Sequence, residues 1–443
     1  MSNILILHGI NYYNAGDHGI LLSMLLAIRK HQPAVNIKVA SPFLAHMQTD
    51  GDYITAVKEG FEGQYPEEIP DLYQLPVGQR RKLRVLAYGL KVVGFTALLT
   101  CMPYEVRKIL AKSTKFSKEL LHTDLVLSKG GGFLLDRGTS YKIPTHLLTI
   151  WIAILMRKKV VIYAQTIGPF DGRLSKKIAQ FVLKRATLVM VRDVYSKDYA
   201  ETKLGLESTK VCLTADSAFA LSTRIGMPRS VRGIRVKSPN QMKRICITLV
   251  SPKFSGLHGQ KFENNYCSMI ASVASQLVEK KYSVIFIPHL ESGGNSDRIL
   301  AQKILKLCPA LAREDIEILP PVNPLKIIET MEDCLLGICS RMHSMIFAIN
   351  ARIPFLGLSY LPKSDSMLSE AGLNSWSLSL SQLASGDSQV GAEKMLSKIE
   401  DILVNIDESY DLAISANHYF TSRSKTNIDK ISPFLNGTPT VTS

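Results

Sequence analysis

Short apolar runs that alternate with helical segments constrain the fold of this chain more than any other feature. Asn3–Leu7, Asp124–Ser128 and Val160–Gln165 are strand-like runs, and predicted helices lie between them. This alternation is typical of a parallel sheet with helices on both faces. The pattern stops at residues 222–243, which are rich in Pro, Gly, Ser and basic residues, and it restarts at Arg244.

The interrupted pattern predicts an α/β protein with two doubly wound, Rossmann-like domains that face each other across a cleft. We expect an N-terminal domain over 1–225, a basic linker over 226–243, a C-terminal domain over 244–390, and helices with a tail over 391–443. A length of 443 residues agrees with this division, because single cores stop growing near ~250–300 residues. Ligands of such sheets bind beyond the carboxyl ends of the strands.

Several segments carry loop or turn signals. Residues 50–80 are polar with Pro and Gly, which predicts a long loop, and Lys129–Gly132 predicts a tight turn. A loop over His8–His18 precedes a helix predicted over Gly19–His31. The last ~20 residues are polar, and we expect them to be loosely ordered.

The net charge of +15 suits an anionic substrate, a nucleic acid or an anionic membrane surface, or it serves solubility alone. Zinc-finger spacing, RNP-like aromatic motifs and long basic runs are missing, so nucleic acid is the least favoured partner. The seven cysteines are scattered without a CxxC pair or a Cys/His cluster. They indicate a reducing, cytoplasmic setting and no metal site.

The start of the chain and one apolar stretch bear on membranes. MSNILILHGI lacks the basic and apolar regions of a signal peptide. Val85–Met102 is apolar, but Lys91 interrupts it and basic residues flank it, so it falls short of a spanning helix. We favour a buried helix with a basic end. The alternative is a helix that leans on a membrane surface or holds a lipid-linked acceptor.

The stretch CSRMHSMIFAIN, residues 339–350, raises the sharpest question about chemistry. Its apolar residues recur at i, i+3, i+4 and i+7 from Met342, which predicts a buried helix with Ser340 as N-cap. Arg341 and His343 then lie in the first turn, where unpaired N–H groups disfavour cations. A bound anion would remove the conflict.

Further polar residues follow predicted strands, and each has a structural alternative. Lys363 lies twenty residues after His343, beyond the next strand, and could reach the same anion. Arg192 suits a carboxylate or phosphate, or an intramolecular ion pair. The remaining candidates could contact a sugar, or serve only as turns and caps: Asn14, Gly16, Asp17, Gly131, Gln165 and Asp216.

As an ordered set, these motifs resemble the polysaccharide pyruvyl transferase family. The set is NAGD, GGG, QTIGPF, RD followed by Ser196, TADSAF, and CSRMHSMIFAINARIPFLGLSYLPKSDSML, over most of residues 1–375. The resemblance implies a GT-B-like fold. It also implies transfer of pyruvate from phosphoenolpyruvate (PEP) to two hydroxyls of a sugar, giving a ketal and phosphate. The start HGINYY departs from the family's usual glycine-rich opening.

The resemblance also implies roles for the candidate residues. Arg341 would bind PEP, His343 would be the acid, and Lys363 and Arg192 would hold the carboxylate or phosphate of PEP. Asp17 would be the base. The acceptor side would comprise Asn14, Gly16, Gly131, Gln165 and Asp216. The reaction needs no metal and no cofactor. The acceptor would be a glycan or a lipid-linked oligosaccharide, in the cytoplasm or at the inner face of the membrane.

Two other functions remain open from the residues. A GT-B glycosyltransferase could place the diphosphate of a nucleotide sugar at the same helix start. A homologue without catalytic activity could bind glycan or scaffold a polymer-synthesis complex. Turnover of PEP separates both from a pyruvyl transferase.

Overall fold

The structure is a computed structural model that describes residues 2–9, 11–42, 51–61, 63, 65–72, 81–136, 142–221, 243–251, 259–291 and 296–435. Contacts divide the chain into two compact units. Unit 1 comprises Met1–Asn11, Ile20–Ser217 and Ser422–Ser443, and unit 2 comprises Tyr12–Gly19 and Ala218–Thr421. Residues 226–242 of the expected linker lie outside the described ranges.

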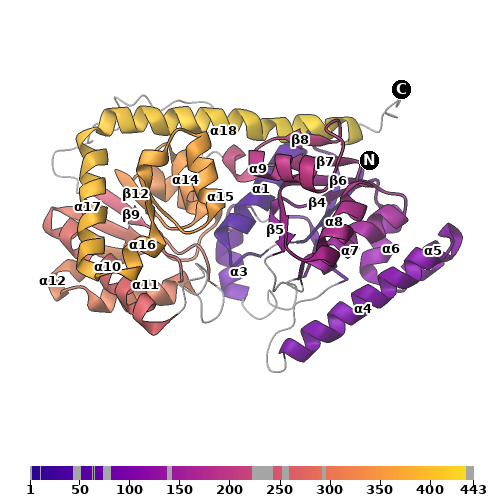
Figure 1. The fold of residues 1–443 in the computed structure, drawn as a ribbon, viewed down its shortest axis with the longest axis horizontal. Coiled ribbons are helices and arrows are strands. Elements are labelled where there is room, and N and C mark those ends of the chain that lie inside the picture. The colour runs from indigo at the N-terminus through magenta and orange to yellow at the C-terminus, as the bar shows by residue number, and fades with distance from the viewer. Residues whose placement is uncertain are drawn as a thin grey trace. The chain divides into compact units, whose positions relative to one another are not determined.

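Unit 1 is built on a parallel sheet (Figure 1). Its strands are β1 (Asn3–Leu7), β2 (Asn36–Ser41), β3 (Glu67–Pro70), β4 (Leu125–Ser128), β5 (Gly131–Asp136), β6 (Lys159–Phe170), β7 (Leu188–Val191) and β8 (Val211–Leu213). They lie in the order β3-β2-β1-β4-β6-β7-β8, and β5 pairs with β6. Every pairing is parallel, which requires crossovers between successive strands.

Helices of unit 1 provide these crossovers and cover the sheet. They are α1 (Ala15–His31, which begins in unit 2), α3 (Gly51–Lys58), α4 (Arg81–Cys101), α5 (Tyr104–Ala111), α6 (Lys115–His122), α7 (Lys142–Leu155), α8 (Arg173–Leu183) and α9 (Val194–Asp198), which continues as a π-helix over Tyr199–Lys203. Buried residues of the strands, such as Val126 and Ile162, pack with Phe116 of α6 and Ile150 of α7 in one core. The apolar strand runs of the sequence are therefore buried on both faces.

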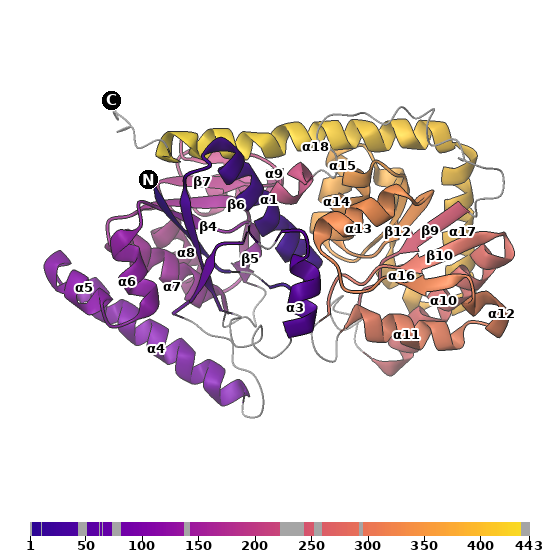
Figure 2. The same ribbon diagram turned by 180° about the vertical axis from the view of Figure 1, so that it is seen from behind.

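Unit 2 has a second parallel sheet, visible from the other side in Figure 2. Its strands are β9 (Lys243–Ile247), β10 (Tyr282–Phe286), β11 (Ile316–Ile318), β12 (Leu336–Cys339), β13 (Phe355–Ser359) and β14 (Ser377–Ser379), in the order β11-β10-β9-β12-β13-β14. Its helices are α10 (Gln260–Glu279), α11 (Asp297–Leu307), α12 (Ala310–Arg313), α13 (Pro324–Glu332), α14 (Met342–Ala351), α15 (Pro362–Glu370), α16 (Leu380–Ser385), α17 (Ser388–Val404) and α18 (Ile406–Leu435, which ends in unit 1). The prediction of two parallel, doubly wound α/β sheets is confirmed.

Four local predictions in the first half and at the end of the chain are wrong. The region 50–80, expected to be a loop, contains α3 and strand β3, which is added to the sheet by pairing with β2. The expected turn at Lys129–Gly132 instead leads into β5, which begins at Gly131 and pairs with β6. Helix α1 begins at Ala15 rather than Gly19. The Asn14 side-chain oxygen accepts the Gly16 and Asp17 N–H groups and so caps the earlier start.

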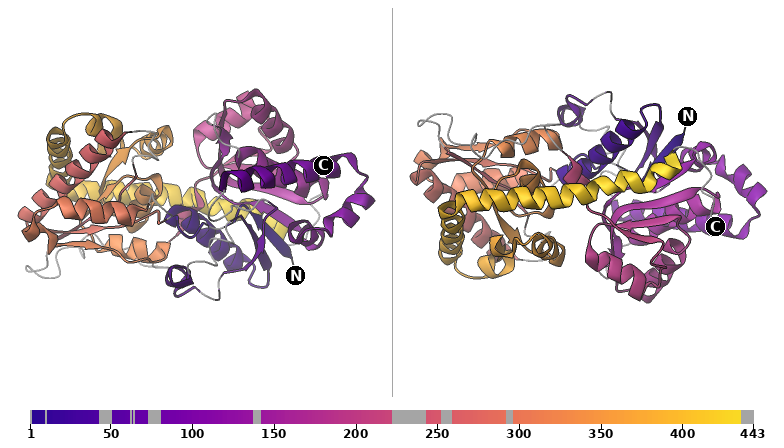
Figure 3. Two further views of the ribbon diagram at one scale, coloured as in Figure 1. Left: turned by 90° about the horizontal axis from the view of Figure 1, so that it is seen from below. Right: turned by 90° about the horizontal axis from the view of Figure 1, so that it is seen from above.

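The fourth concerns the end of the chain. Helix α18 continues as one unbroken helix to Leu435, where we expected loose order (Figure 3). Ile431 and Leu435 are fully buried, so apolar contacts hold a segment whose composition is largely polar. Of the helices within the described ranges, none combines the length and the apolarity needed to cross a bilayer.

Candidate active site

Two histidines and two cationic side chains lie at the carboxyl edge of the unit 2 sheet. Leu249 follows β9, His289 follows β10, Arg341 and His343 follow β12, and Lys363 follows β13. Strands β10, β9, β12 and β13 are neighbours in that order, so these residues lie along one edge. This is the edge at which parallel α/β sheets bind ligands.

The segment with the NAGD motif belongs to unit 2 and is fastened to this edge. The Ala15 N–H donates to the His289 carbonyl at 2.8 Å, and the Glu291 N–H donates to the Tyr13 carbonyl at 2.8 Å. Asn14 forms an antiparallel bridge with Leu290. The first turn of α1 is therefore held by main-chain bonds beside the loop that follows β10.

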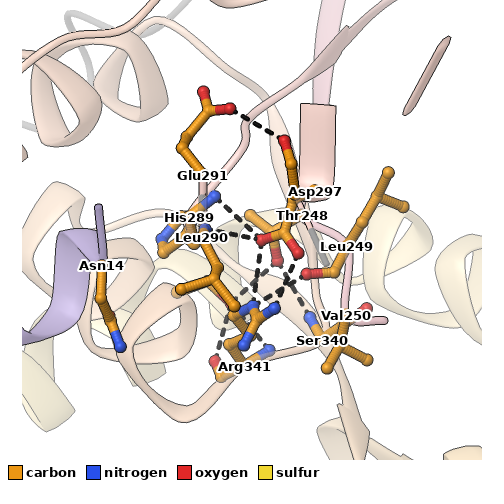
Figure 4. A network of polar contacts seen from close by, with 12 residues as sticks. Asn14, Thr248, Leu249, Val250, His289, Leu290, Glu291, Asp297, Ser340 and Arg341 are labelled. Atoms are coloured by element: carbon orange, nitrogen blue, oxygen red, sulfur yellow. Dashed lines mark hydrogen bonds and ion pairs between the residues drawn. The ribbon is translucent and has the colours of Figure 1, made fainter. Parts of the chain in front are cut away.

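A buried ion pair between Asp297 and Arg341 organises the edge (Figure 4). The carboxylate of Asp297, the first residue of α11, accepts hydrogen bonds from Arg341 Nη2 at 2.7 Å and from Arg341 Nε at 3.1 Å. The same carboxylate accepts the N–H groups of His289 at 3.0 Å and Leu290 at 2.8 Å, while Arg341 Nε also lies 3.1 Å from the Leu249 carbonyl. One ion pair thus joins the segments that follow β9, β10 and β12.

Burial and charge act in opposite directions on this pair. Burial raises the pKa of Asp297 above its ordinary value, while the Arg341 charge and the two N–H donors act against that rise. For Arg341, burial alone would lower the pKa, but the Asp297 carboxylate outweighs it and raises the pKa. Arg341 therefore keeps its charge, and much of its hydrogen-bonding capacity goes to holding the loops in place.

Helix α14 begins one residue later than the sequence suggested. Arg341, not Ser340, is the N-cap, so the prediction of Ser340 as the cap is wrong. The Arg341 N–H donates to the Ser344 hydroxyl at 3.1 Å, and Thr248 Oγ1 lies 2.8 Å from the same hydroxyl. The Ser340 N–H in turn donates to Thr248 Oγ1 at 3.0 Å, which ties the helix start to the end of β9.

His343 is the second residue of α14, and the first turn of α1 packs directly against its imidazole. A Cβ atom placed on Gly16 would lie 2.3 Å from His343 Nδ1, 2.4 Å from Cγ and 2.8 Å from Cβ. Any other residue at position 16 would collide with the imidazole and its root. His343 and the neighbouring Asp17 are both half-buried. The NAGD motif and the R-x-H motif, far apart in sequence, thus meet at one point of unit 2.

Sequence reasoning missed His289, which lies at the same edge. Its Nδ1 is 3.2 Å from the Ile287 carbonyl, and its ring packs against Phe347 with centroids 5.5 Å apart. Burial lowers the pKa of His289 to about 3, and the nearby Arg341 and His343 add to this effect. The imidazole therefore stays neutral down to acidic pH, where a surface histidine would carry a charge.

In unit 1, Arg192 and Asp216 form a buried ion pair, which is the structural alternative for Arg192 considered above. Arg192 Nε also donates to Thr166 Oγ1 at 2.7 Å. Within the described part of the chain, Arg192 Nη2 and Gln165 Oε1 are buried atoms without a hydrogen-bond partner. Gln165 Nε2 donates to the Lys129 carbonyl. Two buried polar atoms thus lack a hydrogen-bond partner, one in the middle of β6 and the other just after β7.

A histidine cluster in unit 1 was also missed. His8 Nδ1 lies 3.1 Å from Ser128 Oγ, and Nε2 lies 3.1 Å from Thr149 Oγ1. His146 stacks on Phe133 with centroids 4.7 Å apart. Burial lowers the pKa of His8 well below its ordinary value. No sequence spacing links these residues, because β1, β4, β5 and α7 bring them together only in the fold.

Metal chemistry has no candidate site in the part of the chain that the structure describes. There, no group of three or more His, Cys, Asp or Glu residues is arranged to hold a metal ion. All seven cysteines are free thiols.

Comparison with solved structures shows the fold class first. UDP-GlcNAc 2-epimerase from Neisseria meningitidis, bound to UDP-GlcNAc, matches 99% of this chain and 100% of its own, with a TM-score of 0.56 and 12% identity. Anabaena Alr3699/HepE, in complex with UDP and glucose, matches 99% of this chain and 100% of its own, with a TM-score of 0.53 and 13% identity. The chain thus has the GT-B-like fold of these epimerases and glycosyltransferases.

Sequence comparison then narrows the class. Residues 14–362 match the polysaccharide pyruvyl transferase family, and the chain belongs to this family. The amylovoran biosynthesis protein AmsJ of Erwinia amylovora is 26% identical over 413 residues, which covers 89% of this chain and 90% of AmsJ. The matched range begins at Asn14 and ends at Pro362, so it takes in both motifs that meet at His343.

Proposed function

We propose that this protein transfers pyruvate from PEP to two hydroxyls of a sugar, in a polysaccharide or its lipid-linked precursor, and releases phosphate. Family membership supports the class of reaction, and the AmsJ relative supports an exopolysaccharide as the polymer. The observation that carries the proposal is the packing of Gly16 against His343 at the start of α14. It sets one titratable imidazole beside the first turns of two helices.

The anion is PEP. It carries about three negative charges near neutral pH, since the second phosphate pKa is near 6. The N–H groups at the start of α14 favour such a ligand. Lys363 lies in the first turn of α15, which follows the neighbouring strand β13, and supplies a further positive charge. By family resemblance, Arg192 in unit 1 also holds the carboxylate or phosphate of PEP.

Arg341 is proposed to do more than contact PEP. Its bonds to Asp297 and to the Leu249 carbonyl fix the start of α14, and its charge favours an anion there. We therefore propose that Arg341 both supports PEP binding and holds the helix that carries His343. A lysine would lose the planar, two-point pairing with Asp297.

His343 acts as the general acid. Its protonated imidazole gives a proton to the methylene carbon of PEP, which turns the enol carbon into an oxocarbenium-like centre. One sugar hydroxyl adds to that carbon, and its proton passes to a base. The C–O bond to phosphate then breaks, and the second hydroxyl closes the ketal and gives up its proton. One hydroxyl proton replaces the proton that His343 gave to the methyl group, and the other goes to the departing phosphate, which leaves as HPO₄²⁻.

Asp17 is the proposed base for the attacking hydroxyl, because it directly follows the glycine that contacts His343. Asn14 and Gly16 belong to the same turn. In unit 1, Gly131, Gln165 and Asp216 are proposed acceptor contacts by family resemblance. Asp216 already pairs with Arg192, so it also orients that guanidinium.

The test is release of phosphate from PEP with a panel of oligosaccharide and lipid-linked acceptors. We expect acceptor-dependent release by the wild type, a large loss in His343→Asn, and no change in the control His31→Asn at the exposed end of α1. Consumption of a nucleotide sugar without any PEP dependence would establish the glycosyltransferase instead. Binding of glycan with neither turnover would establish the non-catalytic homologue.

A further inference from the structure

The outward face of α4 is largely apolar over residues 87–101. Leu90 is 64% exposed and Leu98 is 42% exposed, and Val93 beside them is 50% exposed. The exposed small residues on the same stripe are Ala87, Gly94, Ala97 and Cys101. These positions recur every three to four residues, so they share one side of the helix. An exposed apolar face of this kind marks a surface for binding a partner or a membrane.

The opposite side of α4 is buried in unit 1. The helix therefore already packs on the core through that side, and the outward face is a second apolar face. Val92, Thr96 and Leu99 are fully or almost fully buried, and Val92 and Leu99 belong to the core of the unit. Figures 1 and 2 show α4 and α5 lying along one margin of this unit, next to α6 and α7. Helix α4 therefore has a packed side and an unpartnered apolar side.

Helix α5, which follows α4 in the chain, carries further exposed apolar side chains and adds positive charge. Ile109 is 68% exposed and Val106 is 37% exposed. Residues 91–121 contain six basic and two acidic side chains. Both acids already pair with lysines: Glu105 with Lys108 at 2.7 Å, and Glu119 with Lys38 at 3.0 Å. An apolar face with a basic surround is the pattern of an interfacial helix on anionic lipid.

A basic hollow opens beside this surface. It has a volume of about 470 Å³, and its charged lining residues are Lys108, Lys112, Lys158 and Glu105, with Ile109 among the apolar ones. Ile109, one of the exposed apolar residues of α5, thus lies at the hollow. The lysine ammonium groups of the hollow could bind a lipid phosphate at the surface of a bilayer. The leucines of α4 would then contact the acyl chains.

The surface is preformed. Arg107 Nε donates to the Leu99 carbonyl at 2.7 Å, and Arg107 Nη1 donates to the Leu155 carbonyl at 3.2 Å, which ties the corner between α4 and α5 to α7. Trp151 Nε1 donates to Thr100 Oγ1 at 3.1 Å from the same helix α7. Docking would therefore not have to order these helices, and the entropic cost of binding is reduced.

We propose that the outward face of α4 and α5 docks on an anionic bilayer surface. Leu90, Leu98 and Ile109 enter the boundary between headgroups and acyl chains, and the lysines meet lipid phosphates. A second copy of this chain fits less well, because pairing this face with itself would bring like charges together. The proposal stands apart from pyruvyl transfer, although it would bring the enzyme to the place where lipid-linked acceptors are found.

Co-sedimentation of the full chain with vesicles tests the proposal. We expect binding to vesicles with about one-third phosphatidylglycerol, weak binding to pure phosphatidylcholine, and at least ~10-fold weaker binding at high salt. The variant Leu90→Glu/Leu98→Glu should lose at least ~10-fold in binding, as should Lys108→Glu/Lys112→Glu. The control Leu311→Glu changes a side chain that is 86% exposed on α12 and should bind as the wild type does.

Three results would overturn the proposal: no binding of the wild type to anionic vesicles at low salt, undiminished binding by Leu90→Glu/Leu98→Glu, or a self-association in sedimentation velocity that this variant abolishes. Thermal melting of each variant shows that the exposed substitutions leave the fold intact. Phosphate release with a water-soluble acceptor should be unaffected by these variants. A failure of membrane docking is thereby distinguished from a failure of the proposed enzymatic function.

Discussion

The contact between Gly16 and His343 gives a prediction that the geometry makes quantitative. In Gly16→Ala, the new Cβ would lie 2.3 Å from His343 Nδ1. An ordinary contact needs about 3.4 Å or more, so the imidazole or the helix start must move by about 1 Å. Rotation of the ring gives no relief, because Cγ and Cβ of His343 would lie only 2.4 and 2.8 Å away.

A catalytic group misplaced by about 1 Å costs ~10²-fold in rate, which is about 2.7 kcal/mol of transition-state stabilisation. We therefore expect Gly16→Ala to lower kcat for phosphate release from PEP about 100-fold. Overpacking also costs about 1–3 kcal/mol of stability, which alanine's better helix propensity offsets by up to ~1 kcal/mol. The protein should thus stay folded, with a modest fall in Tm.

The matched control is Gly51→Ala, since a Cβ on Gly51 at the start of α3 meets nothing within 4 Å. It should leave both kcat and Tm nearly unchanged. The assay is steady-state phosphate release at saturating PEP, with Tm measured for each variant. A Gly16→Ala enzyme that is folded and turns over within two-fold of the wild type would refute the argument that this contact positions His343.

Three further predictions follow from the same edge of unit 2. Asp297→Asn leaves the largely buried Arg341 charge without its carboxylate and should reduce the free energy of unfolding by up to about 3–5 kcal/mol in urea titration, while Asp297→Asn/Arg341→Met should recover part of that loss. Because the pKa of His289 is lowered to about 3, its contribution to stability is present above pH ~6.5 and is lost as the pH falls toward 3. In His289→Gln the free energy of unfolding should therefore change less steeply with pH between 6.5 and 3, by up to ~1.4 kcal/mol per pH unit. The same slope as in the wild type would contradict the argument that His289 is buried in its neutral form. His343→Asn should lower kcat by about 10²–10⁴-fold with PEP binding retained in calorimetry, and loss of PEP binding alone would assign His343 to binding instead.

The sequence predicted the helix that carries His343, with its N-cap one residue too early, because the signals for that helix are local. Apolar residues at helical spacing follow an apolar strand, and the cations in the first turn pointed to an anion. The partner of Arg341 was not predictable in this way, since Asp297 lies 44 residues earlier in the chain. No local rule pairs an arginine at one helix start with an aspartate at another. Only the neighbouring positions of β10, β9 and β12 bring them together.

The missed elements have the same origin. Strand β3 has a polar sequence, EEIP, and becomes a strand by pairing with β2 in a finished sheet. Gly131 sits in a run of glycines that reads as a turn, yet its backbone pairs with Gln165 of β6. The long α18 was underestimated because its polar residues conceal the few buried ones, such as Ile431. In each case a tertiary contact outweighs the local propensity.

The central claim is that this protein protonates the methylene carbon of PEP and that His343 delivers the proton. The most direct test is the reaction in D₂O, with mass spectrometry of the pyruvylated acceptor. The account predicts one deuterium in the ketal methyl group with the wild-type enzyme, and loss of product formation in His343→Asn at unchanged PEP binding. A ketal methyl group without deuterium, or a His343→Asn enzyme that forms labelled product at the wild-type rate, would contradict it.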